Sequence, residues 1–316
     1  MLINCAELSQ YVNHSVTIQG HLVGLECRQG RNGHPFYRLK LADSYGSVRA
    51  YIWNNSPLFD YVKTISVGDQ HLAEFNGRIS YLNGHCLLKL SEIYLISPSH
   101  VFNGAALLPV SLVPVRARAA HAWLIDFLGN LSNEPLRAFL TGILSDPELG
   151  YRFIRSRASG GYHRAYPGGL LVHSVEVAKL AGLCAEALGE PALSIAITQV
   201  GALLHDFGKI DTVGEKNPRP MDPRLFQHEL RTIHLLAPYV NQLKQMSQIE
   251  GMVITHLIGR LAQKKNFGEQ TMAEMLIRFA DQTSAAHQAK EKIEQFIKRL
   301  PKSTNQTEDH ELSHSG

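Results

Sequence analysis

The sequence predicts a multidomain protein in which a small all-β barrel is followed by an all-α domain, and three observations support this prediction. Residues 1–98 contain short runs in which apolar and polar side chains alternate, as they do in half-buried strands. Residues 117–300 instead carry apolar side chains at helical spacing. Between them, residues 99–116 are rich in turn-forming residues and prolines, which is typical of a semi-rigid linker.

Five strand-like runs are expected in the N-terminal region. They are residues 16–23, 36–41, 48–53, 72–79 and 85–95. Turn-forming residues such as Asn83-Gly84 separate the runs, and residues 57–64 can form a short helix between the third and fourth strands. This order of elements resembles the OB-fold, a small five-stranded barrel, so we expect residues 1–98 to form one.

The second and third strands are expected to present a mixed aromatic and basic face to solvent. Period-two alternation directs the apolar residues between them inward and leaves six side chains outward: Phe36, Arg38, Lys40, Arg49, Tyr51 and Trp53. Bases stack on aromatic rings at about 1–3 kcal/mol each, while arginine and lysine follow the phosphates. The face therefore predicts single-stranded RNA or DNA binding. The alternative is that Phe36 and Trp53 pack against the helix or the second domain.

The C-terminal region is expected to begin with two helices. Residues 117–130 and 134–144 have helical apolar spacing, and Asn133 is an expected N-cap before Glu134-Pro135. Asp146-Pro147 is expected to close the second helix. Residues 301–316 are polar and without apolar periodicity, which predicts a disordered tail.

A metal site is predicted where an apolar helical run, residues 201–209, ends in adjacent His205 and Asp206. Further ligands are available in other helical segments: His173, His228, His256 and Asp281. Imidazole and carboxylate ligands suit manganese, iron, magnesium or zinc rather than ions that require thiolates. Two ions about 3.5–4 Å apart, bridged by Asp206, would activate a water molecule and clamp a phosphate. One or two divalent ions are therefore expected.

The ordered set of His173, His205-Asp206 and Asp281 resembles the HD superfamily of metal-dependent phosphohydrolases. Members with two ions resemble a longer pattern, in which His228 and His256 would supply the additional ligands. The resemblance implies hydrolysis of a phosphate ester with Asp206 in a catalytic role. Lys209, one turn further on, could place its ammonium against phosphate charge, although a solvated lysine is an equally simple interpretation.

Four arginines stand close together ahead of the first proposed ligand, with no acidic residue among them. They lie within residues 151–164: Arg152, Arg155, Arg157 and Arg164. They could form a basic lip that leads a polyanion to the metal, with Arg157, Arg164 and the neighbouring His163 as phosphate contacts. The alternative is a solvated helix face with its arginines paired elsewhere.

Composition excludes some classes of protein. The net charge of +3 is too small to argue for nucleic acid by itself. No apolar run is long enough to span a bilayer and no targeting segment is evident, so a cytoplasmic protein without a membrane partner is expected. The four cysteines show no Cys-x-x-Cys pairing, which favours reduced thiols over a zinc ribbon.

The combination of the two modules resembles the YhaM family of bacterial 3′–5′ exoribonucleases. Three motifs add to the resemblance: Gly33-His34-Pro35-Phe36, Ala50-Tyr51-Ile52-Trp53, and Tyr162-His163 ahead of Gly169-Leu170. The resemblance implies manganese-dependent, or similar metal-dependent, removal of nucleotides from a single-stranded 3′ end, with some capacity for DNA. The family often has paired histidines where this chain has His163-Arg164 and His256-Leu257.

Two other functions stay open. One is a phosphohydrolase of small nucleotides, in which the barrel only packs or supports a homo-oligomer. The other is a DNA-processing or DNA-binding partner, because residues 166–173 also resemble the helical domain of some conjugative relaxases. The exonuclease is preferred because the outward aromatic and basic face and the four arginines favour a polymeric substrate.

Overall fold

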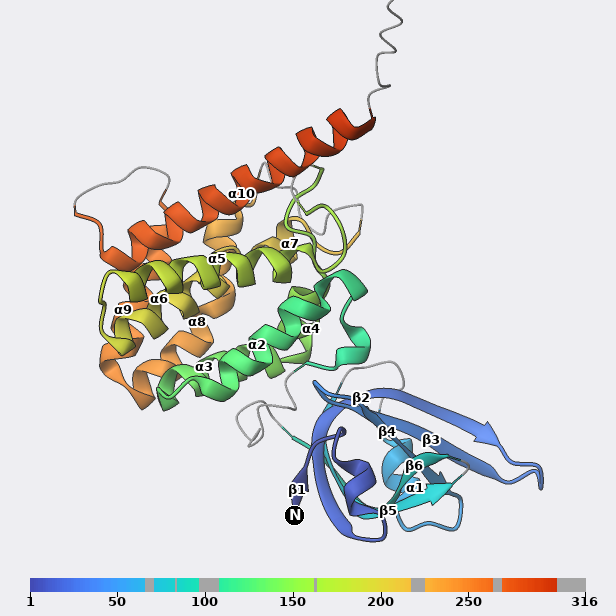
Figure 1. The fold of residues 1–316 in the computed structure, drawn as a ribbon. Coiled ribbons are helices and arrows are strands. Elements are labelled where there is room, and N and C mark those ends of the chain that lie inside the picture. Colours follow the sequence, from blue (N-terminus) through green and yellow to red (C-terminus); the bar gives the residue numbers. More distant parts are fainter. Residues whose placement is uncertain are drawn as a thin grey trace, which may run out of the picture.

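The computed structural model describes residues 1–65, 71–82, 84–96, 108–161, 164–216, 225–263 and 269–299. Within these ranges a β-barrel is followed by a group of helices (Figure 1). His163, much of the predicted linker and the predicted tail at 301–316 lie outside the described residues.

The N-terminal region is a five-stranded barrel with one additional short strand. Its elements are β1 (Leu2–Ile3), β2 (Ser15–Gln29), β3 (Pro35–Ala42), β4 (Ser47–Trp53), α1 (Phe59–Lys63), β5 (His71–Leu82) and β6 (His85–Leu95). The sheet order is β1-β2-β3-β4-β6-β5, and β2 also pairs with β5, so the five longer strands close on themselves. Strands β4 and β6 pair in parallel. This OB-like barrel confirms the predicted fold, with α1 between the third and fourth long strands.

The alternation predicted for the second and third long strands is present in the barrel. Leu39, Ala50 and Ile52 point into its core and are at most 2% exposed. The residues between them face outward, and the register places Phe36 opposite Trp53. The side-chain period of two therefore sorts these strands into a core face and a solvent face.

The C-terminal region is helical, as predicted. Its helices are α2 (Arg118–Asn130), α3 (Glu134–Ser145), α4 (Pro147–Arg155), α5 (Gly169–Ala187), α6 (Ala192–Leu204), α7 (Lys209–Thr212), α8 (His228–Met246), α9 (Gln248–Leu261) and α10 (Met272–Arg299). The Asn133 side chain accepts a hydrogen bond from the amide of Leu136 at the start of α3. Asp146 ends α3 and also caps α4, through the amides of Glu148 and Leu149. Among the described helices, none combines the length and the apolar character needed to cross a bilayer.

The core of the helical region holds α5 and α6 together, and α10 crosses over them (Figure 1). Helix α5 begins at a pair of glycines. Gly168 has a φ of +83°, and a Cβ on Gly169 would lie 2.0 Å from the carbonyl oxygen of Arg164. Both positions therefore favour glycine, the first for conformation and the second for space.

The barrel and the helices contact each other through the turn after β3. The amide of Val110 donates to the carbonyl of Asp43 over 3.0 Å. Nearby, the His21 ring of β2 meets the Tyr151 ring of α4 edge-on, with their centroids 4.9 Å apart. Both rings are buried, so this contact joins the two regions through packed side chains.

Close to the predicted metal site, helix α8 passes directly over Gly208. A Cβ there would lie 2.0 Å from the carbonyl oxygen of His228. The Gly208 amide donates to the Thr232 hydroxyl over 2.8 Å, and that hydroxyl donates to the His228 carbonyl over 3.0 Å. Because the φ of Gly208 is an ordinary −62°, space rather than conformation requires glycine here.

A buried carboxylate ties three helices together. Asp211 of α7 is 4% exposed and lies between Arg152 of α4 and Arg231 of α8. Burial opposes the charge of Asp211, but hydrogen bonds from Arg231 and Arg152 outweigh it and hold the pKa of the carboxyl below its usual value. The arrangement fixes the segment that follows Asp206.

We expect Asp211→Asn to lower the free energy of unfolding by about 2–4 kcal/mol, because two guanidinium groups would face a neutral amide. The folded-state pKa of Asp211 is depressed, so its contribution is complete above the unfolded-state pKa and is lost as the pH falls through the folded-state value. The difference between wild type and variant should narrow in acid. Chemical denaturation at neutral and acidic pH measures both effects. Glu134→Gln, which breaks an exposed pair with Arg137, should cost at most about 1 kcal/mol.

We expect Gly208→Ala to destabilise the protein by about 1–3 kcal/mol or more, because the facing atom belongs to the backbone of α8 and cannot rotate away. It should also weaken Mn²⁺ binding measured by calorimetry, since His228 would move. Gly259→Ala is the matched control. It lies within α9 with nothing within 4 Å of the added carbon, and alanine there should stabilise the helix by up to about 1 kcal/mol. Equal effects of the two substitutions would contradict the close approach.

Candidate metal centre

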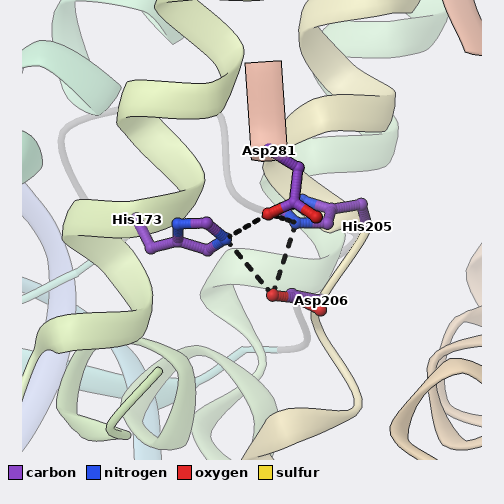
Figure 2. A group of neighbouring side chains, drawn as sticks. All are labelled: His173, His205, Asp206 and Asp281. Carbon is purple, nitrogen blue, oxygen red and sulfur yellow. Dashed lines mark ion pairs between the residues drawn. The ribbon is translucent and has the colours of Figure 1, made fainter. Parts of the chain in front are cut away.

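Four side chains from three helical segments meet at one point, where only the Asp281 side chain, 44% exposed, is open to solvent (Figure 2). His173 projects from α5 and Asp281 from α10, while His205 and Asp206 follow the last residue of α6. One ligand atom from each of the four lies within 4.8 Å of the others. The apolar run before His205 is buried in the core, so the chain ends its helix with two polar side chains aimed at this point.

The two imidazoles face the two carboxylates. His173 Nε2 lies 3.3 Å from Asp206 Oδ2 and 3.1 Å from Asp281 Oδ1. His205 Nε2 lies 3.3 Å and 3.7 Å from the same two oxygens. Ligand atoms held at about 2.1 Å from a tetrahedral ion are about 3.4 Å apart, so this spacing suits a divalent ion between them.

The hydrogen bond at the other nitrogen of His205 shows why a cation fits. Nδ1 lies 2.7 Å from the carbonyl oxygen of Ala202, which can only accept, so Nδ1 carries the proton. In the neutral ring, Nε2 then directs a lone pair at the carboxylate oxygens, and a positive charge must lie between them. Burial alone would lower the pKa of His205, but Asp206 and Asp281 outweigh it and raise the pKa to about 10. The donor set therefore favours a cation strongly.

Asp206 faces two directions. Its Oδ2 points to the two imidazoles and also meets the ammonium of Lys209, whereas its Oδ1 lies 3.2 Å from His228 Nε2. Burial would raise the pKa of Asp206, but Lys209 and the histidines hold it well below its usual value. A carboxylate with ligand groups on both oxygens is suited to bridging two ions.

His256, the remaining proposed ligand, is placed differently. It lies on α9 with an exposed side chain and is not part of the group of four. His228 is half-buried at the first turn of α8 and touches Asp206. Of the two additional histidines, only His228 is brought next to the group within the described chain.

The four arginines do not form a free basic lip. Arg152 pairs with Asp211, Arg155 with Glu215 and Arg164 with Glu176. Arg157 is 6% exposed and donates to the carbonyl oxygens of residues 213, 214 and 216. Arg157 and Arg164, for which phosphate contacts were predicted, thus make contacts within the protein, with partners that lie 12 to 59 positions away in the sequence.

The predicted outward face of the barrel is present on β3 and β4. Trp53 is 45% and Tyr51 36% exposed, and both rings lie near Phe36, with centroid separations of 4.7 Å and 6.1 Å. Trp53 is therefore not packed beneath other elements. Next to the rings, a hollow is lined by Val23, Gly24, Glu26, Arg38, Leu39, Lys40 and Arg49.

One acidic side chain in this hollow modifies the predicted face. Glu26 accepts both of its 2.9 Å hydrogen bonds to Arg38 from the same guanidinium nitrogen, and it also pairs with Arg28. These hydrogen bonds lower the pKa of Glu26. Lys40 and Arg49 have no such ion pair among those found in the described residues.

Two residues next to the centre, Glu176 and Ser284, were not predicted from the sequence. Ser284 lies 3.3 Å from His173 Nδ1, and its hydroxyl donates to Glu176 over 3.0 Å. Each follows a proposed ligand by three positions, Glu176 after His173 and Ser284 after Asp281. Because residues three apart share a helix face, this spacing was the available signal.

Comparison with known proteins identifies a domain family in the helical region. The HD domain matches residues 170–286. Ribonuclease Y of Pseudothermotoga lettingae is 30% identical over 172 residues, which are 52% of this chain and 28% of that protein. The 3′-5′ exoribonuclease YhaM of a Geobacillus species is 24% identical over 179 residues, 57% of this chain and 52% of that protein. The chain thus spans about a quarter of the first relative's length and half of the second's.

Among solved structures, a domain of replication protein A from Methanococcus maripaludis is 24% identical and covers 30% of this chain and 96% of that domain, with a TM-score of 0.24. The family match spans α5 to the middle of α10, the elements that carry all four clustered side chains. The chain therefore contains an HD domain at residues 170–286, behind an OB-like barrel, and has homologues named Ribonuclease Y and YhaM.

Proposed function

We propose that the protein is a metal-dependent phosphodiesterase that cleaves single-stranded nucleic acid, as a 3′–5′ exonuclease acting on RNA. The observation that carries the proposal is the convergence of His173, His205, Asp206 and Asp281 within an HD domain. The names of the relatives, Ribonuclease Y and 3′-5′ exoribonuclease YhaM, support the substrate and the direction of cleavage.

The four clustered side chains would hold one divalent ion, and His228 with Asp206 Oδ1 would contribute to a second. Manganese is proposed from the resemblance, and iron, magnesium or zinc also suit these ligands. The bound metal would supply Lewis-acid polarisation of the phosphate and a water of lowered pKa. Asp206 orients the centre because it contacts both imidazoles, His228 and Lys209.

Lys209 has a charge-balancing role in this proposal. Its ammonium contacts Asp206, and the Lys209 side chain is 19% exposed. An anionic phosphate that approached the centre would meet this ammonium as a point charge. Its contact with Asp206 favours a catalytic role for Lys209 over a fully solvated lysine.

The barrel would supply the substrate-binding platform. Trp53, Phe36 and Tyr51 form a continuous aromatic cluster on the outer face, beside Lys40 and Arg49. Stacking on rings accepts any base, so this face suits a single strand without fixed sequence. A phosphohydrolase of small nucleotides would not need such a surface to bind its substrate.

We expect end-labelled single-stranded RNA to be shortened in the presence of Mn²⁺ into a ladder that retains the 5′ label, and the reaction to stop with chelator. Asp206→Ala should abolish both shortening and Mn²⁺ binding, because this carboxylate faces both proposed ion positions. Asp126→Ala, which removes an exposed acid of α2, is the control. Products that retain only the 3′ label would show that cleavage proceeds from the 5′ end and would contradict the proposed direction. Phosphate release from mononucleotides without shortening of RNA or DNA would refute the nuclease proposal.

We expect Trp53→Ala to weaken the binding of long single strands about 5- to 150-fold, which corresponds to the loss of about 1–3 kcal/mol of base stacking. Binding of very short strands and Mn²⁺ should be unaffected. Fluorescence anisotropy with labelled strands of increasing length measures the effect. Tyr61→Ala removes a comparably exposed aromatic from α1, off the β3–β4 face, and should leave binding unchanged. Equal losses in the two variants would contradict the assigned face.

A further inference from the structure

A chain of side chains leads away from the candidate metal centre through the second nitrogen of His173. Nδ1 of His173 lies 3.3 Å from the hydroxyl oxygen of Ser284. That hydroxyl donates to Glu176 Oε2 over 3.0 Å, and Glu176 pairs with Arg164. His173 and Ser284 are each 8% exposed, so bulk water does not readily replace the contact between them, whereas the side chain of Glu176 is 43% exposed.

The order of donors along this chain determines where His173 carries its proton. Glu176 accepts from the Arg164 guanidinium, and a carboxylate in such an ion pair can only accept. Ser284 has a single proton and donates it to Glu176, so its oxygen can only accept from His173. Nδ1 must then bear the hydrogen, and Nε2 directs its lone pair at Asp206 and Asp281.

His205 also carries its proton on Nδ1, but a different kind of hydrogen bond holds it there. Its Nδ1 donates to the carbonyl of Ala202, a backbone acceptor that no substitution removes. The centre therefore holds two imidazoles in the same tautomer, one through the backbone and one through side chains. Only the hydrogen bonds of His173 depend on the identity of neighbouring side chains. His205 therefore serves as an internal control for substitutions around His173.

The chain of contacts also joins the two helices that carry outer ligands. Glu176 belongs to α5, as His173 does, and Ser284 belongs to α10, as Asp281 does. The hydrogen bond between Ser284 and Glu176 therefore spans the same helix pair that brings His173 and Asp281 to within 3.1 Å. A shift of α10 along α5 would break both contacts together.

We propose that Ser284 and Glu176 are positioning residues, which hold His173 with its proton on Nδ1 and its Nε2 free to bind the metal, while Arg164 holds Glu176. The inference rests on the proposed role of His173 as a metal ligand. It assigns Arg164 a place in the metal centre in addition to its position before α5, instead of a direct phosphate contact.

Glu176→Leu is the sharpest variant because it keeps a side chain of similar size and removes the oxygen that accepts from both Arg164 and Ser284. The serine hydroxyl, which then lacks this acceptor, can donate to Nδ1, and the His173 proton moves to Nε2. Ser284→Ala removes the acceptor altogether. Both should weaken Mn²⁺ binding measured by calorimetry about 10- to 100-fold, the usual effect of removing the partner that orients a ligand histidine.

The matched control is Thr283→Ala, which deletes an exposed hydroxyl from the adjacent residue of α10 and should bind Mn²⁺ like wild type. Ser284→Thr retains the hydroxyl and should restore most of the affinity lost in Ser284→Ala. Thermal unfolding with chelator reports whether each metal-free variant is folded. These comparisons separate a loss of positioning from a loss of stability.

Nuclear magnetic resonance of the zinc-loaded full chain, with nitrogen-15 in its histidines, gives a readout independent of activity. The Nδ1–H of His173 should be protected from exchange with water in wild type and Thr283→Ala, and unprotected in Ser284→Ala. The Nδ1–H of His205 should remain protected in all of them. Unchanged protection of His173 and unchanged affinity in both test variants would overturn the positioning role while leaving the metal centre intact. A wild-type protein that binds neither Mn²⁺ nor Zn²⁺ would overturn the metal centre and this inference with it.

Discussion

The concentration of two carboxylates and two imidazole nitrogens in one small, partly buried volume requires positive charge. The side chains of His173, His205 and Asp206 are at most 10% exposed, so water reaches this volume mainly beside Asp281, whose side chain is 44% exposed. Without a cation, Asp206 and Asp281 repel each other and the imidazole lone pairs as well. The surrounding helices therefore hold together a group of atoms that a divalent ion, or protons in its place, must stabilise. A site held against such repulsion binds a cation tightly because its ligands are already in position.

The packing of the helices follows from the need to hold these four side chains. The core beneath α5, α6 and α10 fixes three backbones, and each contributes ligands at its inner side. Gly208 allows α8 to approach the turn after Asp206, which brings His228 to the far oxygen of the same carboxylate. Asp211 then binds arginines from α4 and α8 and fastens that turn to both. Gly208 and Asp211, which closely follow Asp206 in the sequence, thus help to position it.

The barrel, the helical domain and the four clustered metal-site residues could be predicted because each leaves a pattern in a short stretch of sequence. Alternation with period two separates Leu39 from Arg38 by residue type alone, and a helix that ends in adjacent histidine and aspartate needs partners for both. The contacts of the four arginines could not be predicted in the same way, because their partners are distant in sequence. Arg155 meets Glu215 sixty positions later, and Arg157 meets backbone carbonyls that carry no sequence signature. Ser284 was missed for a similar reason, since its contact with Glu176 crosses between two helices.

The HD domain and the barrel face act on one substrate in the proposed function, and their linkage has an energetic consequence. A strand that occupies the aromatic face of β3 and β4 is held at a high effective concentration near the centre, provided it is long enough to reach both. A short strand gains only the contacts of one site. Substrate length therefore becomes a determinant of affinity without any base-specific contact, because stacking on Trp53, Phe36 and Tyr51 accepts every base. If the protein shortens its strand as proposed, that second contact would be lost at a length set by the span between the sites, and a short product would then be released.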